Sequence, residues 1–246
     1  MMLRKWEDLP PNMQTEEVRA YYDILKKKKC SLFFKRLFDI VVSLVLLLVL
    51  SPVFLILAIA IKIDSRGPVF YRQVRVTRYG KEFRIFKFRS MVRGADQKGT
   101  AVTVRDDVRV TRMGKIIRQC HFDEISQLID VLRGEMTLVG TRPEVPKYVE
   151  RYTPEMMATL LLPAGITSMA SVYYKDEAEL LKAGDNVDDT YVYTVLPAKM
   201  YYNLKSIREY SFWKDIKTLF MTVFAVFGKE YKGDYQPVEQ EEVAMR

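Results

Sequence analysis

The pattern of apolar and polar positions is dominated by one long uncharged segment. The residues from Ile40 to Ile61 include no charged side chain. At about 1.5 Å per helical residue, a helix of this length could just cross a hydrocarbon core roughly 30 Å thick. Ser51 and Pro52 lie in the middle and predict a break in the helix. Proline lacks an N–H and clashes with the carbonyl one turn earlier, at Leu48, and the serine hydroxyl can bond back to a carbonyl of the preceding turn.

Both flanks of this segment are basic, which bears on how it would meet a membrane. Before it lie Lys26–Lys29, Lys35 and Arg36, and after it lie Lys62, Arg66, Arg72, Arg75 and Arg78. Spanning helices concentrate basic residues on the cytoplasmic side, so a helix that enters, breaks and returns would satisfy both flanks. The alternative is an ordinary spanning helix with a proline kink. A signal peptide is disfavoured, because the apolar run starts late, is too long and lacks a small-residue cleavage pattern.

The rest of the chain predicts a mostly α fold with a small β-hairpin. Apolar and charged residues alternate strictly over residues 81–89, which predicts a half-buried strand. Residues 69–73 would pair with it across Tyr79-Gly80. A helix is predicted to open at Asp123-Glu124 and to stop at Gly134, with one apolar face formed by Ile125, Leu128, Ile129 and Leu132.

Other segments give coarser expectations. Residues 100–114 are polar and charged, residues 137–143 and 160–165 are expected to be loops or turns, and residues 144–152 are expected to be helical. Residues 212–227 carry a broad apolar helical face that suits either an in-plane interfacial helix or a core helix, since such a stripe does not tell lipid from protein. The tail after Gly228 is acidic, and we expect it to be disordered.

Composition narrows the chemistry. The chain has 246 residues and a net charge of +8, which suits nucleic acid or anionic lipid as a partner. The adjacent apolar segment favours the lipid surface and phosphate-bearing ligands, and no nucleic-acid motif is present. Cys30 and Cys120 form no disulfide framework and are expected to stay reduced. His121 is the sole histidine, which argues against a His-based metal cluster or a Ser-His-Asp system, and we expect it to be solvated or packed.

The sharpest candidate for chemistry is the pair Asp123-Glu124. Acidic residues at a helix start are often simple caps, favoured by the helix dipole. Here, however, Arg118 precedes the pair and Arg142 follows it. Such an arrangement suits a diphosphate held by arginine and a divalent ion held by carboxylate. A carboxylate at a helix N-terminus should stay ionised, and in a dry pocket it can attack phosphorus.

Eight short motifs, in order, give the chain a resemblance to a known family. It resembles the bacterial sugar transferases, the monotopic phosphoglycosyl transferases that act on polyprenyl phosphate. The resemblance runs from about Lys35 to Phe227. The motifs are Lys35-Arg36-Leu37-Phe38-Asp39, Ser51-Pro52, Gly67-Pro68-Val69-Phe70-Tyr71-Arg72-Gln73, Phe86-Lys87-Phe88-Arg89-Ser90-Met91, Asp107-Val108-Arg109-Val110-Thr111-Arg112-Met113-Gly114, Asp123-Glu124 with Gln127-Leu128, Gly134-Glu135-Met136-Thr137-Leu138-Val139-Gly140, and Arg142-Pro143.

The resemblance implies a reaction. Asp123 would attack the β-phosphorus of a UDP-sugar, expel UMP and hold the phosphosugar covalently. Polyprenyl (undecaprenyl) phosphate would then attack that intermediate and leave as a polyprenyl diphosphate sugar. Glu124 would bind Mg²⁺ as the cofactor. In the same family pattern, the residues that would contact phosphate or the nucleotide sugar are Arg118, Arg142, Pro143, Lys87 and Arg89.

The resemblance also implies an architecture and a place in the cell. Ser51-Pro52 would break a re-entrant membrane helix. The expected parts are an N-terminal surface arm (1–34), the re-entrant helix-break-helix (35–63), a compact cytoplasmic catalytic domain with in-plane amphipathic helices (64–228) and an acidic tail (229–246). The protein would lie on the cytoplasmic face of the bacterial inner membrane, and a homo-oligomer is left open. Residues 162–177 depart from the family pattern, because an arginine before the proline and an Asn-Gly-Arg run are missing.

Two alternative functions are kept. The same reaction could proceed by a single direct displacement, with Asp123 serving only a metal. The chain could instead be a non-enzymatic, membrane-tethered binding protein, which predicts that the two ends of the apolar segment lie on opposite sides of the membrane.

Overall fold

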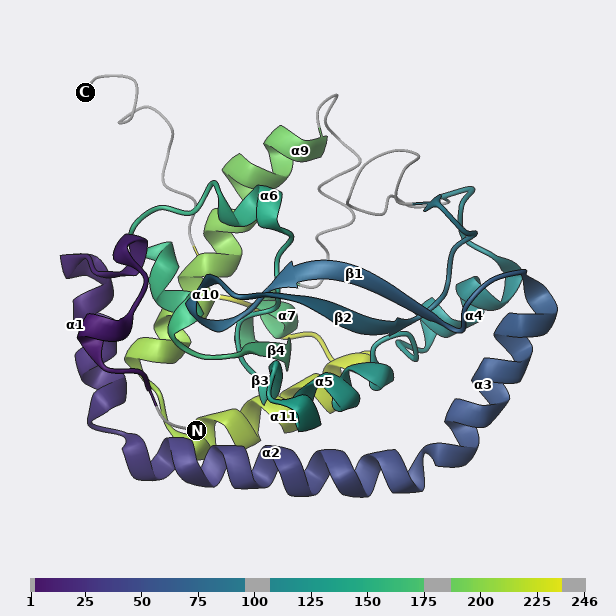
Figure 1. Ribbon diagram of the computed structural model, residues 1–246, viewed down its shortest axis with the longest axis horizontal. Coiled ribbons are helices and arrows are strands. Elements are labelled where there is room, and N and C mark those ends of the chain that lie inside the picture. Colours follow the sequence, from purple (N-terminus) through teal and green to yellow (C-terminus); the bar gives the residue numbers. More distant parts are fainter. Residues whose placement is uncertain (1–2, 96–106, 175–186, 236–246) are drawn as a thin grey trace.

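The computed structural model describes residues 3–95, 107–174 and 187–235. Within these ranges the protein is mostly helical, with two small two-stranded sheets (Figure 1). The α-helices are α1 (Glu16–Lys26), α2 (Lys29–Val49), α3 (Ser51–Asp64), α4 (Arg112–Gln119), α5 (Leu128–Arg133), α6 (Pro146–Val149), α7 (Met169–Tyr173), α9 (Val187–Thr190), α10 (Leu196–Arg208) and α11 (Phe212–Val226). The strands are β1 (Phe70–Val76), β2 (Glu82–Phe88), β3 (Met136–Val139) and β4 (Ala164–Thr167).

The remaining elements are short. They are the 3₁₀ helices η1 (Trp6–Asp8), η2 (Pro11–Met13), η3 (Arg78–Gly80), η5 (Ile125–Gln127) and η6 (Met156–Leu161), and the π-helical turn η7 (Tyr191–Val195), which leads into α10. Residues 100–106 and the tail from residue 236 lie outside the described residues, so the expectations for those segments are not addressed by the structure.

The predicted break in the apolar segment is confirmed. α2 ends at Val49, α3 begins at Ser51, and the two helices meet at an angle of 61°. The Ser51 hydroxyl donates to the carbonyl of Leu48 at 2.8 Å, as the sequence predicts, and Pro52 occupies the first turn of α3, where its missing N–H costs nothing. None of the described helices is long and apolar enough to cross a membrane alone. The bent pair together has the required length and composition.

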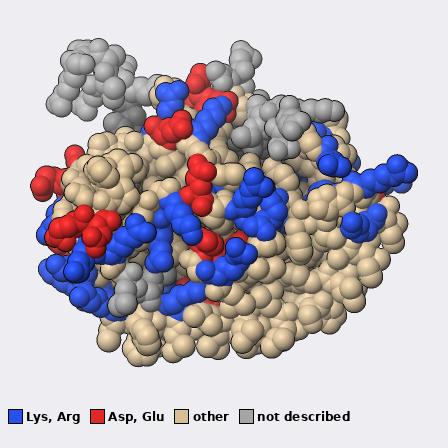
Figure 2. Space-filling view, in the orientation of Figure 1, with Lys and Arg blue, Asp and Glu red and all other residues tan. Residues whose placement is uncertain are grey.

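The bent pair frames one side of the molecule. In Figure 1 α2 runs along the lower edge and α3 rises from its end, with the rest of the chain packed inside the angle. Their outward side chains are apolar and exposed, among them Leu44, Leu48, Val49, Leu55 and Ile56. Figure 2 shows this lower edge without charged side chains, whereas Lys, Arg, Asp and Glu gather over the middle and left of the visible face.

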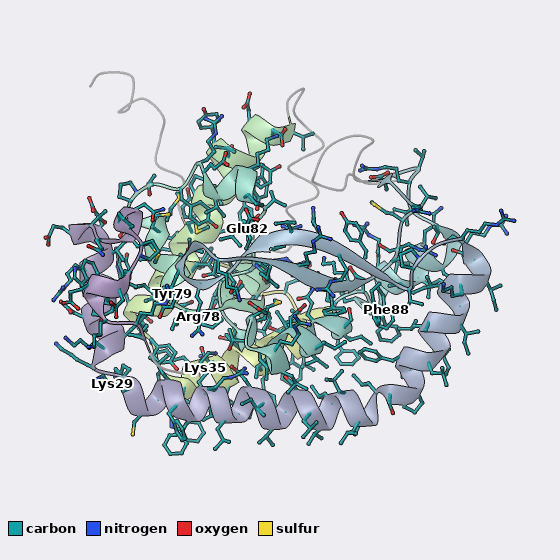
Figure 3. The ribbon with its side chains drawn as sticks, viewed as in Figure 1. Lys29, Lys35, Arg78, Tyr79, Glu82 and Phe88 are labelled. Carbon is teal, nitrogen blue, oxygen red and sulfur yellow. The ribbon has the colours of Figure 1, made fainter. Side chains whose placement is uncertain are left out.

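Three charged residues near the start of α2 turn the other way, into the body. Figure 3 shows Lys35 pointing from α2 toward the interior. Its Nζ donates to the carbonyl of Val139 and to Asp215, both at 2.7 Å. The Asp39 carboxylate accepts from the Thr137 hydroxyl at 2.6 Å and from the Leu138 N–H at 3.2 Å. Thus α2 is docked by buried polar contacts onto β3 and onto α11, which contributes Asp215.

Arg36 completes this docking from the next position along α2. Its guanidinium donates to the carbonyls of Val131 at 2.7 Å and Leu132 at 3.2 Å, in the last turn of α5. Cationic side chains are favoured at a helix C-terminus, where carbonyl groups lack helical partners. The Lys35-to-Asp39 motif is therefore the joint between the bent helix pair and the body.

The N-terminal segment is part of the body. Residues 1–34 were expected to form a surface arm, either a short helix or a loose strand of chain. The helix α1 forms, and Val18, Tyr21, Tyr22 and Leu25 on one of its faces are buried against residues of η6 and α10. The spacing of these four residues puts them on one helical face. The expected boundary after residue 34 falls inside α2, which begins at Lys29.

The predicted hairpin is confirmed. β1 and β2 pair antiparallel, with Phe70 opposite Phe88 and Val76 opposite Glu82. The turn passes through Tyr79 and Gly80, both with positive φ, as a tight hairpin connection requires. The alternation in β2 buries Phe83 and Ile85, while Arg84 between them stays exposed. Phe88 is out of this phase and is buried in a separate cluster with residues of α3 and α4.

A second sheet was not expected. The loop predicted over residues 137–143 is wrong in its first part, because β3 forms there and pairs in parallel with β4, in the segment where a turn was expected. Gly140, just after β3, closely approaches Gly165 within β4, where a Cβ on Gly165 would lie 2.2 Å from the Gly140 nitrogen. Only glycine permits this approach of two backbones. The short pairing joins segments distant in sequence, which local periodicity does not report.

The docking of α2 gives the first prediction. Replacing Lys35 by Ala leaves Asp215 without its ion-pair partner, and we expect a loss of about 3–5 kcal/mol in unfolding free energy. Thermal unfolding of the detergent-solubilised chain would measure it. Lys29→Ala, at an exposed position of the same helix, should change stability by less than about 0.5 kcal/mol. Equal melting of both variants would refute the proposed joint.

A second prediction concerns Asp130, buried in α5 with its carboxylate accepting the Phe86 N–H at 2.7 Å. Burial raises the pKa of Asp130 to about 6. The folded state therefore binds this proton more tightly than the unfolded state does. Its contribution to stability is present below about pH 4 and is lost as pH rises through about 6.

Asp130→Asn keeps an acceptor for Phe86 and removes the titration. We expect this variant to be less sensitive than the wild type to pH between 4 and 7 in urea unfolding, by about 3 kcal/mol at most. A wild-type stability that rises over this range by as much as that of the variant would contradict the assignment.

Candidate active site

The candidate site is assembled from three separate segments. Lys87 comes from β2, Asp123 and Glu124 from the turn between α4 and η5, and Arg142 from the loop after β3. The turn is joined to the end of β2, because the Phe88 N–H donates to the Asp123 carbonyl at 3.1 Å. The Ser126 hydroxyl donates to the Phe86 carbonyl, also at 3.1 Å. These bonds set the two carboxylates beside the Lys87 side chain.

The Glu124 carboxylate is held by two cations. Arg142 binds it with both terminal nitrogens, Nη1 reaching Oε2 at 2.9 Å and Nη2 making a short contact with Oε1. Lys87 Nζ donates to Oε1 at 3.2 Å. Burial alone would raise the pKa of Glu124, but the charges of Arg142 and Lys87 outweigh it, and that pKa lies far below its usual range. Glu124 is therefore a permanent anion that orients two cations.

Asp123 is in a different state from its neighbour. Its Oδ2 lies 3.8 Å from Lys87 Nζ, and no hydrogen bond from a side chain holds the carboxylate within the described residues. Burial raises the pKa of Asp123 above its ordinary value, although the charges of Lys87, Arg118 and Arg142 oppose that shift. The side chain is still 15% exposed, so a ligand can reach it. A desolvated carboxylate with a raised pKa is a more basic and more reactive nucleophile than one in water.

The cap interpretation of the acidic pair is not what the structure shows. Glu124 occupies the position before η5, but its side chain makes no capping hydrogen bond. The helix itself begins with the 3₁₀ turn at Ile125 and ends at Gly134, whose φ of 80° fits the predicted stop. Both carboxylates are instead directed to the cationic side chains from β2 and from the loop after β3.

The other residues expected at the site are distributed between it and the scaffold. Arg118 lies on α4, near enough for its charge to act on Asp123. The carbonyl of Pro143 accepts from Arg75 Nη1 at 3.1 Å, which fixes the loop carrying Arg142 to β1. His121 is exposed, as expected, with a backbone φ of 55°.

Arg89, which was also expected to contact ligand, lies between the end of α3 and the hairpin. Its guanidinium is buried and donates to the carbonyls of Ser65 at 2.7 Å and Arg66 at 3.1 Å, and to the Ser65 hydroxyl at 2.9 Å. Arginine side chains commonly bond the unpaired carbonyls at the end of a helix. Arg89 thus ties the end of α3 to the hairpin.

A buried polar cluster beside the site was missed by the sequence reasoning. Glu144 accepts from the Tyr191 hydroxyl at 2.6 Å and from Lys199 at 3.3 Å, and lies 3.9 Å from Arg75. Burial alone would raise the pKa of Glu144, but Lys199 and Arg75 outweigh it and the net shift is downward. The cluster holds the Arg142-Pro143 segment between β1 and α10. In the sequence, the only indication of this cluster is that Glu144 directly follows Arg142-Pro143.

The carboxylates at the site are the donors that a bound Mg²⁺ would use. Among the described residues, no group of three or more His, Cys, Asp and Glu side chains could form a metal cage. Mg²⁺ often binds through only one or two carboxylates together with substrate phosphates. Asp123 and Glu124 are donors of that kind, so they fit a magnesium–diphosphate complex better than a bare ion.

Comparison with known proteins shows which family the chain matches. The family model described as bacterial sugar transferase matches residues 30–229. A UDP-glucose:undecaprenyl-phosphate glucose-1-phosphate transferase of Klebsiella pneumoniae is 35% identical over 201 residues, which are 80% of this chain and 41% of the relative. An undecaprenyl-phosphate glucose phosphotransferase of Komagataeibacter xylinus is 39% identical over 196 residues, covering 77% of this chain and 35% of the relative.

A shorter relative is matched over more of its length. A UDP-glucose:undecaprenyl-phosphate glucose-1-phosphate transferase of Caulobacter vibrioides is 34% identical over 192 residues, covering 77% of this chain and 68% of the relative. By contrast, the chain spans less than half of the Klebsiella and Komagataeibacter proteins. The match nevertheless includes the bent helix pair, both sheets and every segment of the candidate site, and the chain belongs to the bacterial sugar transferase family.

Proposed function

We propose that this protein transfers a sugar 1-phosphate from a UDP-sugar to polyprenyl (undecaprenyl) phosphate and releases UMP, as the first membrane step of surface glycan assembly. The observation that carries the proposal is the pairing of Asp123 with a cation-bound Glu124 beside Lys87 and Arg142. The names of the relatives, which include UDP-glucose:undecaprenyl-phosphate glucose-1-phosphate transferases, support the same reaction class.

In the proposed mechanism Asp123 is the nucleophile. A carboxylate oxygen of Asp123 forms a bond to the β-phosphorus of the UDP-sugar, and the bond from that phosphorus to the oxygen bridging it to UMP breaks. An oxygen of polyprenyl phosphate then attacks the same phosphorus, the bond to Asp123 breaks, and the carboxylate is restored. Charge is conserved in both steps, since each exchanges one anionic oxygen for another.

Arg142 and Lys87 reduce the repulsion between the attacking carboxylate and the diphosphate. Both cations lie within about 4 Å of Glu124 or Asp123 and are held there before any substrate arrives. Arg118, in the last turn of α4, can approach the same phosphates, because its charge acts on Asp123 and no ion pair is found for it within the described part of the chain. Glu124 keeps Arg142 and Lys87 oriented, so its role includes positioning as well as metal binding.

Asp123 and Glu124 would hold Mg²⁺ together with the diphosphate. When bound, the ion would neutralise charge on the phosphate oxygens. Both carboxylate oxygens of Glu124 already accept from Arg142. For Glu124 to bind Mg²⁺, this contact with Arg142 would have to be shared or displaced.

The exposed apolar surfaces suit a re-entrant attachment to the cytoplasmic face of the inner membrane. Besides the outer sides of α2 and α3, α11 exposes Trp213, Phe220, Phe224 and, just beyond its end, Phe227. A helix with one broad aromatic face is typical of elements lying in the membrane plane. In this arrangement the active site would meet the acceptor phosphate at the headgroup level.

The covalent step gives a prediction. Purified protein mixed with UDP-sugar and Mg²⁺, without lipid, should release up to one equivalent of UMP and gain the mass of a phosphosugar. Asp123→Asn should abolish the adduct and lower turnover by about 10³-fold or more. The matched control Asp23→Asn, on the exposed side of α1, should behave as wild type. Normal turnover without any adduct or acceptor-independent UMP would favour the single displacement instead.

The attachment gives another prediction, which the two native cysteines allow. Cys30 precedes the apolar segment and Cys120 follows it, and both are exposed. A membrane-impermeant maleimide should label both single-cysteine variants, Cys30→Ser and Cys120→Ser, from the cytoplasmic side only. Labelling of the two cysteines from opposite sides would overturn the re-entrant arrangement and favour a spanning helix.

A further inference from the structure

A cavity of about 420 Å³ lies between α7, α10 and α11, apart from the catalytic pair. This volume falls in the range of small-molecule sites. Neither Asp123, Glu124, Lys87 nor Arg142 lines it. Its nearest approach to the candidate active site along the chain is Thr141, the neighbour of Arg142. The cavity is therefore a second possible binding site rather than part of the one already described.

The lining of the cavity carries excess positive charge. Three of its lysines are balanced by carboxylates of the same lining: Lys35 by Asp215, Lys205 by Asp234 and Lys214 by Glu209. Lys217 and Lys232 also line it, and neither forms an ion pair within the described residues. The lining thus has two positive charges that its own carboxylates do not balance, which favours an anionic occupant.

Part of the wall is aromatic. Tyr210 lines the cavity and is only 5% exposed. Tyr173 and Tyr202, whose ring centroids are 5.1 Å apart, add apolar surface to the same lining.

The position of the cavity relative to α11 indicates which class of ligand it could bind. Lys214, Lys217 and Thr218 line the cavity from α11, whereas Trp213, Phe220 and Phe224 on that helix are exposed. A helix is about 10 Å across, so the cavity would lie one helix diameter from the exposed aromatic face. If that face lies in a membrane, the cavity would lie near the depth of lipid phosphates.

We propose that this cavity binds a phosphate-bearing anion, with Lys217 and Lys232 pairing with the phosphate. Two sources share this chemistry, the headgroup of an anionic phospholipid and a soluble phosphate ester. The proposal needs no catalysis at Asp123.

The test is a binding titration of the full chain in detergent, followed by ³¹P NMR line broadening. The probes are inorganic phosphate, AMP, dihexanoylphosphatidylglycerol and, as a zwitterionic comparison, dihexanoylphosphatidylcholine. We expect at least one anionic probe to bind wild type and Asp123→Asn equally. Preference for the phosphatidylglycerol identifies a lipid headgroup, and preference for phosphate or AMP identifies a soluble ligand.

Two pairs of lysine substitutions distinguish binding in this cavity from nonspecific attraction of the anion to surface charge. Lys217→Gln combined with Lys232→Gln should weaken binding at least tenfold. Lys28→Gln combined with Lys29→Gln removes the same charge from exposed positions outside the cavity and should leave binding within twofold.

Several results would overturn the proposal. One is that no anionic probe binds. Another is that binding disappears in Asp123→Asn but persists in the Lys217/Lys232 pair variant, which would place the probe at the catalytic pair. Equal weakening in both lysine pair variants would show surface charge attraction only. Failure of UMP release in the covalent assay, by contrast, would leave this binding result unchanged.

Discussion

The arrangement of the whole molecule depends on the docking of α2 onto the body through Lys35, Arg36 and Asp39. Buried charges are costly unless they are paired and hydrogen-bonded. Here every one of them meets a partner, and all the partners belong to β3, α5 or α11. The outer, apolar sides of α2 and α3 take no part in this docking, and their side chains are left exposed.

This joint also sets the position of the chemistry. Asp39 and Lys35 bind the backbone of β3 or the side chain of Thr137, and Arg142 follows directly after that strand. At the other end of the bent pair, Arg89 ties the end of α3 to the hairpin next to Lys87. The cations of the candidate site are thus held by the two elements that contact the bent helix pair.

The two adjacent carboxylates illustrate how burial and charge separate roles. Glu124 is bound by Arg142 and Lys87 and stays ionised, whereas burial raises the pKa of Asp123, which has only a 3.8 Å contact with Lys87. Two groups of the same chemistry thereby acquire different basicity within one turn of chain. In the proposed mechanism, one orients the cations and the other attacks phosphorus.

The sequence by itself determined the features that depend on neighbouring residues. Ser51-Pro52 predicted the break and a hydroxyl bond back to the preceding turn, because a proline and its preceding turn interact locally. Period-two alternation predicted the hairpin, and Asp123-Glu124 stood out by its chemistry and by a family resemblance. Tertiary structure alone decided the β3–β4 pairing, the structural role of Arg89 and the Glu144 cluster with Arg75, Tyr191 and Lys199. Each of these joins residues far apart in the chain, and a local pattern records that a residue is polar or apolar but not which distant group it will meet.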